Sequence, residues 1–257
     1  MKNNNKEEND ELRWLHHVRY VELEMIKEFL LIHKNSKILE IGGGDGFQAK
    51  ILSNEGFSVV SVDIEPRSPQ VFPVQKIDNN KLNFSNETFD IIFTSHVLPH
   101  IQNIEDIFDE IKRVIKKDGI IIHVVPTSGW SLITNILHYI FIPKFLIKSI
   151  KKKISNKLNC QINSKQKIQK EKSNQTILKK LFLHPLGQNK SFIHEIVFFS
   201  YKNWKKIFFN SGFEITNVKR GPYITSGYGV FKFKLILIRK KFSKYFFSSS
   251  YCFVLKL

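Results

Sequence analysis

The chain has 257 residues, enough for one large domain or for one domain with a sizeable insertion. Hydrophobic residues make up 42% and charged residues 25%, close to the globular average, which argues against wholesale disorder. The formal net charge of +17 is typical of proteins that contact phosphate, in nucleic acid or on a membrane surface, although a lysine-rich coding bias produces the same excess.

The start of the chain and its two cysteines predict a cytoplasmic protein. Residues 1–10 are polar and lack the apolar core of a secretory signal. Cys160 and Cys252 have neither metal-ligand spacing nor the pattern of a disulfide framework, which favours a reducing compartment. No uninterrupted apolar run is long enough for a clear transmembrane helix, and residues 129–147 come nearest.

The first half of the chain alternates between helical and strand patterns. Apolar residues at three- and four-residue spacing predict a helix over 12–33, after a polar start that we expect to fray. The alternation that follows predicts an α/β fold, with a parallel sheet covered by helices on both faces. The expected strands are 37–41, 58–62, 72–77, 89–94 and 120–125, and the expected helices are 47–55 and 105–115.

The alternation stops after residue 126 and returns near residue 198. Residues 127–194 contain 13 lysines and a single acidic residue, Glu171; the first part is apolar and aromatic, the second rich in lysine and asparagine. We interpret 127–197 as an inserted basic, amphipathic lid. A helix over 201–210 and strands over 214–218 and 231–239 are expected beyond it. The predicted organisation is an N-terminal helical segment (1–35), a core domain in two parts (36–126 and 198–240), the lid, and an unplaced tail (241–257).

A glycine loop joins the predicted strand 37–41 to the predicted helix 47–55, with the sequence Glu40-Ile41-Gly42-Gly43-Gly44-Asp45-Gly46. Glycines at alternate positions let the backbone turn tightly and let a ligand approach it. A dinucleotide-binding loop requires a small residue where this chain has Phe47. The carboxylate of Glu40, two residues before the first glycine, suits a ligand with a cationic group better than a pyrophosphate.

Two further carboxylates follow the next strands at the same edge of the sheet. Asp63 ends the second strand, where nucleotide-binding α/β sheets place a carboxylate that accepts hydrogen bonds from both ribose hydroxyls. Asp78 follows the third strand. A helix cap and a turn residue are the structural alternatives for Asp63 and Asp78.

With the segments 38–46, 62–63, 77–78, 84–90 and 95–100, the chain resembles the class I S-adenosylmethionine-dependent methyltransferases, and among them the type 11-like branch that methylates small molecules. The resemblance covers about residues 36–126 and 198–240. It implies a Rossmann-like, seven-stranded sheet with helices on both faces, S-adenosylmethionine as the cofactor, and methyl transfer as the activity.

The resemblance also implies which residues surround each part of the cofactor. An acid would hold the methionine amino group, directly or through water, while the glycine loop passes under the methionine and the ribose. The implied contacts are Glu40 with the amino group; Gly42, Gly44 and Gly46 with the methionine and ribose; Asp63 with the ribose hydroxyls; Ile64 with the adenine ring; Asp78 and Asn79 with the adenine amino group; and Ser95 near the sulfonium.

Transfer to a hydroxyl also needs a base, a role that neutral histidine fits. The candidates are His96, His100, His184 and His194. The resemblance favours His100, although Pro99 stands where many relatives have Glu, and a structural hydrogen bond is an equal alternative. A pair formed by His194 and Glu195 would also orient a base, with a plain surface pair as the alternative. No metal is predicted, because the histidines and carboxylates lack ligand spacing.

We expect methylation of oxygen in a small-molecule, glycan or lipid-linked acceptor. The apolar residues 130–150 followed by Lys151–Lys153 fit a peripheral contact with the inner face of an anionic membrane, and a pair of buried lid helices explains the apolar part equally well. The alternative is an RNA or DNA methyltransferase whose basic insert binds phosphates. Residues 94–99 argue against it, since base-amino methyltransferases are expected to carry Asp/Asn-Pro-Pro-Tyr/Phe there.

Overall fold

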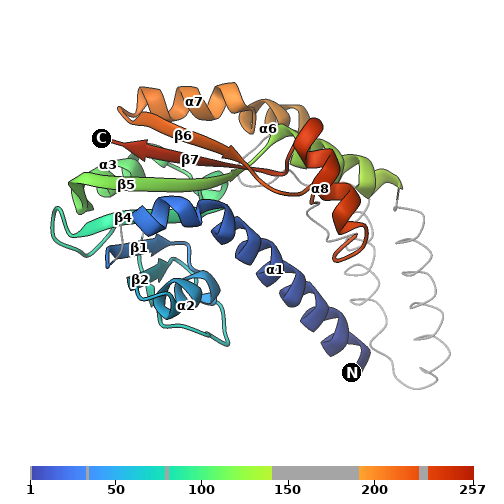
Figure 1. Ribbon diagram of the computed structural model, residues 1–257, viewed down its shortest axis with the longest axis horizontal. Helices are drawn as coiled ribbons and strands as arrows, with labels where there is room; N and C mark the ends of the chain where they lie inside the picture. The colour runs from blue at the N-terminus through green and yellow to red at the C-terminus, as the bar shows by residue number, and fades with distance from the viewer. Residues whose placement is uncertain (1, 33–34, 79–80, 141–190, 226–230) are drawn as a thin grey trace, which may run out of the picture.

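The computed structural model describes residues 2–32, 35–78, 81–140, 191–225 and 231–257 (Figure 1). Its strands are β1 (Lys37–Ile41), β2 (Ser58–Asp63), β3 (Val74–Lys76), β4 (Phe89–Ser95), β5 (Ile115–Pro126), β6 (Glu214–Arg220) and β7 (Ser250–Lys256). They form one sheet of seven strands in the order β3-β2-β1-β4-β5-β7-β6. The strands β1 to β5 pair in parallel, and β7 runs antiparallel to both β5 and β6.

Helices cover both faces of this sheet. They are α1 (Lys2–Ile32), α2 (Phe47–Asn54), α3 (Ile104–Val114), α6 (Phe192–Phe198), α7 (Tyr201–Asn210), α8 (Ile236–Tyr245) and the short 3-10 helix η1 (Leu98–His100); residues 128–140 are also helical. Neighbouring strand residues point to opposite faces, so Ile38 packs with residues of α1 and α2, whereas Leu39 packs with residues of α3 and α7. The predicted α/β fold, with seven strands and helices on both faces, is confirmed.

The C-terminal part differs from the prediction at residues 231–239. The strand expected there is wrong, because α8 begins within it. Arg239 and Ser243, one helical turn apart, face inward: Ser243 Oγ donates to the carbonyl oxygen of Pro222 at 2.6 Å, and Arg239 Nη1 donates to that of Ile224 at 3.3 Å. A strand would bring the exposed Lys241 to that same face, so the helix is the conformation that separates the buried polar side chains from the lysine.

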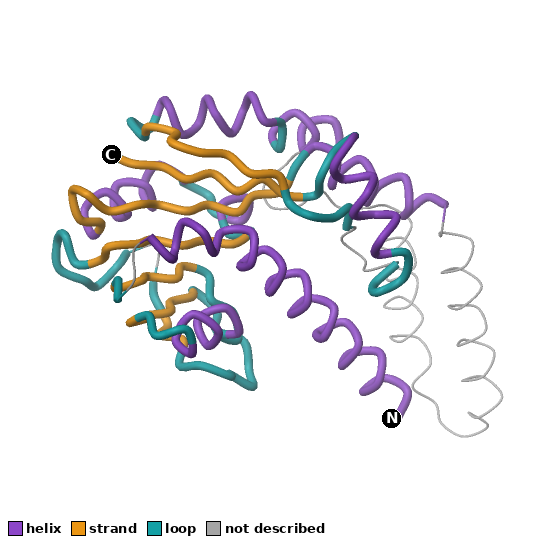
Figure 2. Tube along the Cα trace, viewed as in Figure 1, coloured by secondary structure: helices purple, strands orange, loops and turns teal. Residues whose placement is uncertain are grey.

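The last strand lies in the segment that the sequence left as a tail. Figure 2 shows β7 inserted between β5 and β6, with which it pairs along most of its length. Its residues 252–255 are all buried. A continuous apolar run is typical of a strand covered on both faces, but its partners here are more than thirty residues away along the chain.

The start of the chain also differs from the prediction, and the lid is described only in part. The polar start, expected to fray, is helical from Lys2. Of the predicted lid, the structure describes residues 127–140 and 191–197, while 141–190, which include His184 and Lys151–Lys153, lie outside the described residues. In the described parts of the chain, no helix is both long and apolar enough to cross a bilayer.

Candidate active site

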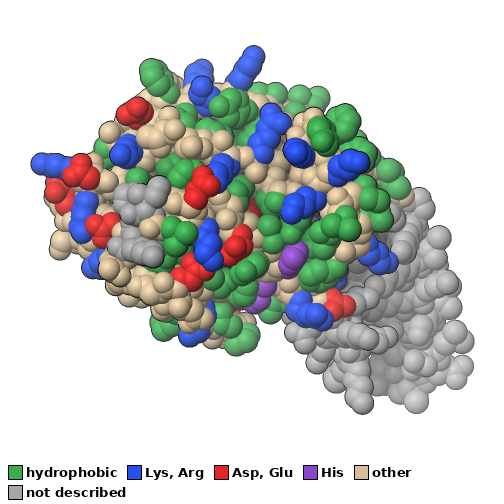
Figure 3. All heavy atoms as spheres, in the orientation of Figure 1, with side chains coloured by type: hydrophobic (Ala, Val, Ile, Leu, Met, Phe, Trp, Pro, Cys, Tyr) green, Lys and Arg blue, Asp and Glu red, His purple; other side chains and the backbone are tan. Residues whose placement is uncertain are grey.

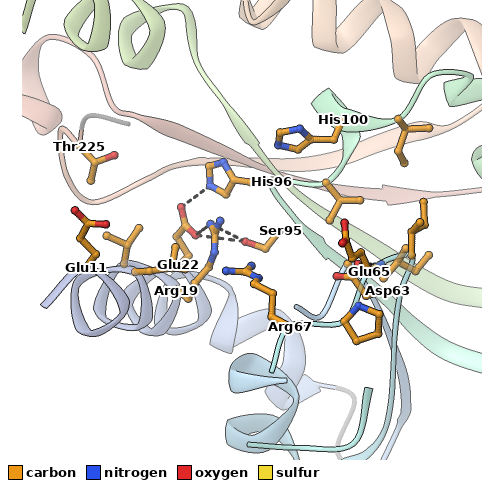
Figure 4. Close-up of a pocket in the computed structure, with 18 of the residues that line it drawn as sticks. Glu11, Arg19, Glu22, Asp63, Glu65, Arg67, Ser95, His96, His100 and Thr225 are labelled. Carbon is orange, nitrogen blue, oxygen red and sulfur yellow. Dashed lines mark hydrogen bonds and ion pairs between the residues drawn. The ribbon is translucent and has the colours of Figure 1, made fainter. Parts of the chain in front are cut away.

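A cavity of about 1080 Å³ lies at the carboxyl ends of β1, β2 and β4. This is the edge at which open α/β sheets bind ligands. One wall comes from the loops after β1 and β2, and the other from α1 and the residues after β4 (Figure 4). Pockets for a single small ligand span roughly 300–1000 Å³, so this cavity can hold a cofactor together with a small acceptor.

The glycine loop crosses the end of β2 with no room for side chains. The backbone N–H groups of Gly42 and Gly43 both donate to the carbonyl oxygen of Val62, at 2.7 and 3.1 Å. A Cβ on Gly43 would lie 1.9 Å from Ser61 Oγ, and one on Gly42 would lie 2.1 Å from a Val97 methyl carbon. Gly42, with φ of 80°, lines the cavity, whereas Gly44 and Gly46, also at positive φ, shape the turn behind it.

Asp63 and Ile64 lie where the sequence places them, in the cavity wall. Asp63 Oδ2 accepts the N–H of Gly44 at 2.8 Å, and its Oδ1 accepts the N–H of Glu65 at 2.9 Å. These two bonds fix the carboxylate at the cavity edge and leave each oxygen with further capacity to accept hydroxyl groups.

The other two acidic positions of the predicted cofactor site do not reach the cavity. Asp78 is exposed and is not among the described residues that line it, although the preceding Ile77 is; Asn79 lies outside the described residues. Glu40 is buried below Gly43, where Ser61 Oγ donates to its Oε2 at 2.6 Å. Burial raises the pKa of Glu40 to about 7, against the hydrogen bond from Ser61 and with help from the charges of Asp45 and Asp63.

The opposite wall holds an ionic network that the sequence reasoning missed. Glu22, buried on α1, accepts a hydrogen bond from Arg19 Nη1 at 2.8 Å. Its other oxygen lies 2.8 Å from Nε2 of His96, the residue that follows β4. Arg19 Nη1 also donates to Ser95 Oγ at 3.2 Å (Figure 4). The available signal was a pair of opposite charges three residues apart beside the apolar stripe of the predicted helix 12–33.

This network holds Glu22 as a carboxylate and His96 as a neutral ring. Burial raises the pKa of Glu22, but the charge of Arg19 and the hydrogen bonds from Arg19 and His96 outweigh it, so this pKa falls below its ordinary value. For His96, burial lowers the pKa and the Arg19 charge adds to this, while Glu22 offsets only part of it. Glu22 therefore accepts the Nε2 proton of His96, whose backbone stands at the unusual φ of 57°.

The remaining predicted catalytic residues divide into two groups. His100, in η1, lines the cavity, and burial together with the charges of His96 and Arg19 lowers its pKa. His194 and Glu195, on α6, are not among the described lining residues. Glu195 is buried and accepts a short hydrogen bond from Ser131 Oγ, while the exposed His194 stacks on Phe198 with ring centroids 6.4 Å apart.

Residues 14–218 match the sequence profile of a family described as methyltransferase domain, which covers most of the chain. The chain belongs to this methyltransferase family. It is a class I methyltransferase, and its cofactor is S-adenosylmethionine. In the described residues, no group of three or more His, Cys, Asp and Glu side chains is placed to hold a metal ion.

Curated relatives of this methyltransferase match less than half of its length. A ubiquinone biosynthesis O-methyltransferase of Rickettsia typhi is 25% identical over 122 residues, which are 42% of this chain and 50% of the relative. The protein of the same name from Rickettsia canadensis is 27% identical over 122 residues, 42% of this chain and 52% of the relative. The chain thus spans about half the length of the curated relatives it matches.

Solved structures share the fold along nearly the whole methyltransferase. A structure from Listeria monocytogenes, described as an S-adenosylmethionine dependent methyltransferase, has a TM-score of 0.52 at 11% identity and covers 92% of this chain and 96% of its own. A SAM dependent methyltransferase from Archaeoglobus fulgidus has a TM-score of 0.51 at 15% identity, with coverages of 93% and 94%. At these identities the likeness shows the fold alone.

Proposed function

We propose that this methyltransferase methylates an oxygen of a small-molecule, glycan or lipid-linked acceptor, with His96 as the general base. The observation that carries the proposal is the pairing of His96 with Glu22 at the cavity. Nε2 of His96 lies 2.8 Å from a carboxylate, while Nδ1 has no hydrogen-bond partner among the described residues and the side chain keeps 20% of its surface exposed. A histidine held at one nitrogen and open at the other is suited to accept a proton.

The two walls of the cavity would bind different parts of the cofactor. When bound, S-adenosylmethionine supplies a methyl group already activated on a sulfonium. Asp63 would accept the ribose hydroxyls, Gly42 would lie under the methionine chain, and Arg19 would face its carboxylate. Side chains of both charges line the cavity, which fits a ligand that itself carries both charges. The basic ones are Arg19, Arg67 and Lys232, and the acidic ones are Glu11, Glu22, Asp63 and Glu65.

His96 would take the proton from the acceptor hydroxyl at Nδ1. Burial keeps the pKa of this ring below its usual value, so the ring is neutral at pH 7 and ready to accept. The imidazolium that forms faces the Glu22 carboxylate, which stabilises it. The partial similarity to relatives named as O-methyltransferases supports an oxygen acceptor.

Labelled methyl transfer from S-adenosylmethionine into a fractionated cell extract tests the acceptor class. The expected result is label in the small-molecule, lipid or glycan fraction, as an O-methyl group. Label in the nucleic-acid fraction would replace this proposal with the alternative of an RNA or DNA methyltransferase. Label on nitrogen or carbon of a small-molecule product would overturn the oxygen acceptor.

The acceptor found in this way then allows the base to be tested. His96→Ala is expected to lower kcat by roughly 100-fold or more without weakening the binding of S-adenosylhomocysteine, and to abolish the fall in rate on the acidic side of pH 6.5. His100→Ala is the matched control, since this second histidine lines the same cavity without a carboxylate partner in the described residues. An inactive His100→Ala beside an active His96→Ala would move the role to His100, as the sequence favoured.

A further inference from the structure

Helix α8 buries polar residues and exposes apolar ones, which is the reverse of a normal surface helix. Its inward side carries the polar residues Arg239 and Ser243, whereas large apolar side chains point outward. The outward set has exposed fractions between 51% and 82% and comprises Leu235, Leu237, Ile238, Phe242, Tyr245 and Phe246. We call these six residues the apolar face of α8. Soluble proteins rarely expose a contiguous apolar set of this kind unless it contacts a partner.

The inward contacts fix the rotation of α8, so that its apolar face cannot turn inward without breaking them. Ser243 Oγ donates to the carbonyl oxygens of Pro222 and Lys240, at 2.6 and 2.9 Å. The Arg239 guanidinium donates to the carbonyl oxygens of Ile224 and Lys232 and lies 5.0 Å from the centre of the Trp14 ring. Detaching the helix would break these hydrogen bonds and the cation–π contact, which favour the docked position.

The charged residues around the apolar face are all basic. Residues 231–247 contain five lysines and one arginine and no acidic residue. Lys234, Lys240, Lys241 and Lys244 are exposed among the apolar side chains. Figure 3 shows this mixture of hydrophobic and basic side chains over α8.

We infer that α8 binds the surface of an anionic lipid bilayer, with its apolar face in the headgroup region and its lysines against the phosphates. Such a surface accepts both features at once, because apolar side chains enter the interface while basic residues near it are attracted to the anionic headgroups. A second copy of this chain fits less well, since a symmetric contact would bring lysines against lysines. A nucleic acid would leave the exposed leucine and isoleucine side chains without a partner.

The bilayer contact places the cavity close to lipid. Thr225 and Lys232, on the two sides of the segment that precedes α8, line the cavity wall. An acceptor dissolved in the bilayer would therefore reach the cavity beside α8, a consequence that rests on the proposed function, whereas the lipid contact itself does not.

Co-sedimentation of the full chain with vesicles tests the inference directly. Vesicles of phosphatidylcholine with 30% phosphatidylglycerol are expected to bind the protein at 50 mM salt. The affinity should fall at least tenfold at 500 mM salt, which screens the attraction, and with phosphatidylcholine alone, which carries no net charge. The double variant Leu237→Gln/Phe242→Gln is expected to lose at least tenfold in affinity. Its control is Phe209→Gln on α7, where the side chain is 77% exposed but lies outside the apolar face.

A second pair of variants separates α8 from the general positive charge of the chain. Lys240→Glu/Lys241→Glu is expected to weaken vesicle binding, while Lys205→Glu/Lys206→Glu, an equally exposed adjacent pair on α7, is expected to retain it. Equal losses in both pairs, wild-type binding by Leu237→Gln/Phe242→Gln, or no binding to anionic vesicles at low salt would each overturn the inference. So would a concentration-dependent dimer in sedimentation equilibrium that only the α8 variants abolish.

Discussion

The two walls of the cavity are built from contacts of very different range. On the glycine-loop side, the bonds that shape the site join residues close in the chain: Gly44 with Asp63 across 19 positions, and Glu40 with Ser61 across 21. On the α1 side, the bonds join Glu22 with His96 across 74 positions and Arg19 with Ser95 across 76. The first wall is the product of one strand–helix–strand unit, and the second exists only because α1 packs back over β4.

This difference separates the tasks of the walls. The glycine-loop wall supplies backbone turns and the half-buried carboxylate of Asp63, which suit a ligand common to a whole family. The α1 wall supplies a buried ionic network and His96 at the cavity, which suit proton transfer from the acceptor. Variants of the glycine-loop wall should therefore change cofactor binding, and variants of the α1 wall should change stability and proton transfer.

The largest expected effect lies in the α1 wall. Glu22→Ala removes the carboxylate that pairs with Arg19 and His96, and we expect a loss of about 3 kcal/mol in the free energy of unfolding, measured with urea, because a largely buried guanidinium loses its counter-charge. The control is Glu24→Ala, whose exposed pair with Lys27 is expected to contribute far less to the free energy of unfolding. Similar small losses in both variants would show that the network does not hold the wall together.

In the glycine-loop wall, Asp63→Ala is expected to weaken the binding of S-adenosylhomocysteine by about 2–3 kcal/mol, since a fixed pair of acceptors is lost. Isothermal titration calorimetry measures this directly. Glu65→Ala removes the same charge from the same cavity and should change the affinity by much less. Unchanged affinity in Asp63→Ala would refute the placement of the ribose.

Beneath the same wall, Glu40 should give the methyltransferase a pH-dependent stability. Its pKa in the folded protein, about 7, lies above the ordinary value of 4.5, so the folded state binds more protons between these values. The contribution of Glu40 to the free energy of unfolding is therefore full below about pH 4.5 and is lost as the pH rises through 7. The free energy should fall by up to about 1.4 kcal/mol per pH unit in this range. Comparing urea unfolding of wild type and Glu40→Gln from pH 5 to 8 should show the slope difference, and parallel curves would contradict it.

The smallest effect is expected where the walls meet. His16 on α1 lies 2.7 Å from Asp45 Oδ2 in the glycine loop and stacks on Phe47 with ring centroids 3.9 Å apart. A double-mutant cycle of His16→Ala and Asp45→Ala should give a coupling of about 1 kcal/mol in the free energy of unfolding. A coupling near zero would mean that the two walls behave independently.

The sequence indicated which residues build the glycine-loop wall, but it did not indicate the contacts of the α1 wall. The glycine loop, Asp63 and Ile64 could be placed because their spacing along one strand–helix–strand unit already implies one sheet edge. The burial of Glu40 against Ser61 could not be read from the sequence, since this contact depends on the register between β1 and β2. The hydrogen bond from Ser131 to Glu195 joins two helices whose orientation sequence spacing does not give.

By itself, the sequence determined the fold class, the cofactor edge of the sheet and the resemblance to class I methyltransferases, because these depend on hydrophobic periodicity and on residues fewer than about thirty positions apart. Only the tertiary structure decided that residues 250–256 complete the sheet, that α1 brings Glu22 to His96, and that α8 turns its apolar face outward. The physical reason is the same in all three cases. Each depends on a distant partner (a strand edge, a buried charge or a set of backbone carbonyls) that selects one of several conformations which the local sequence permits.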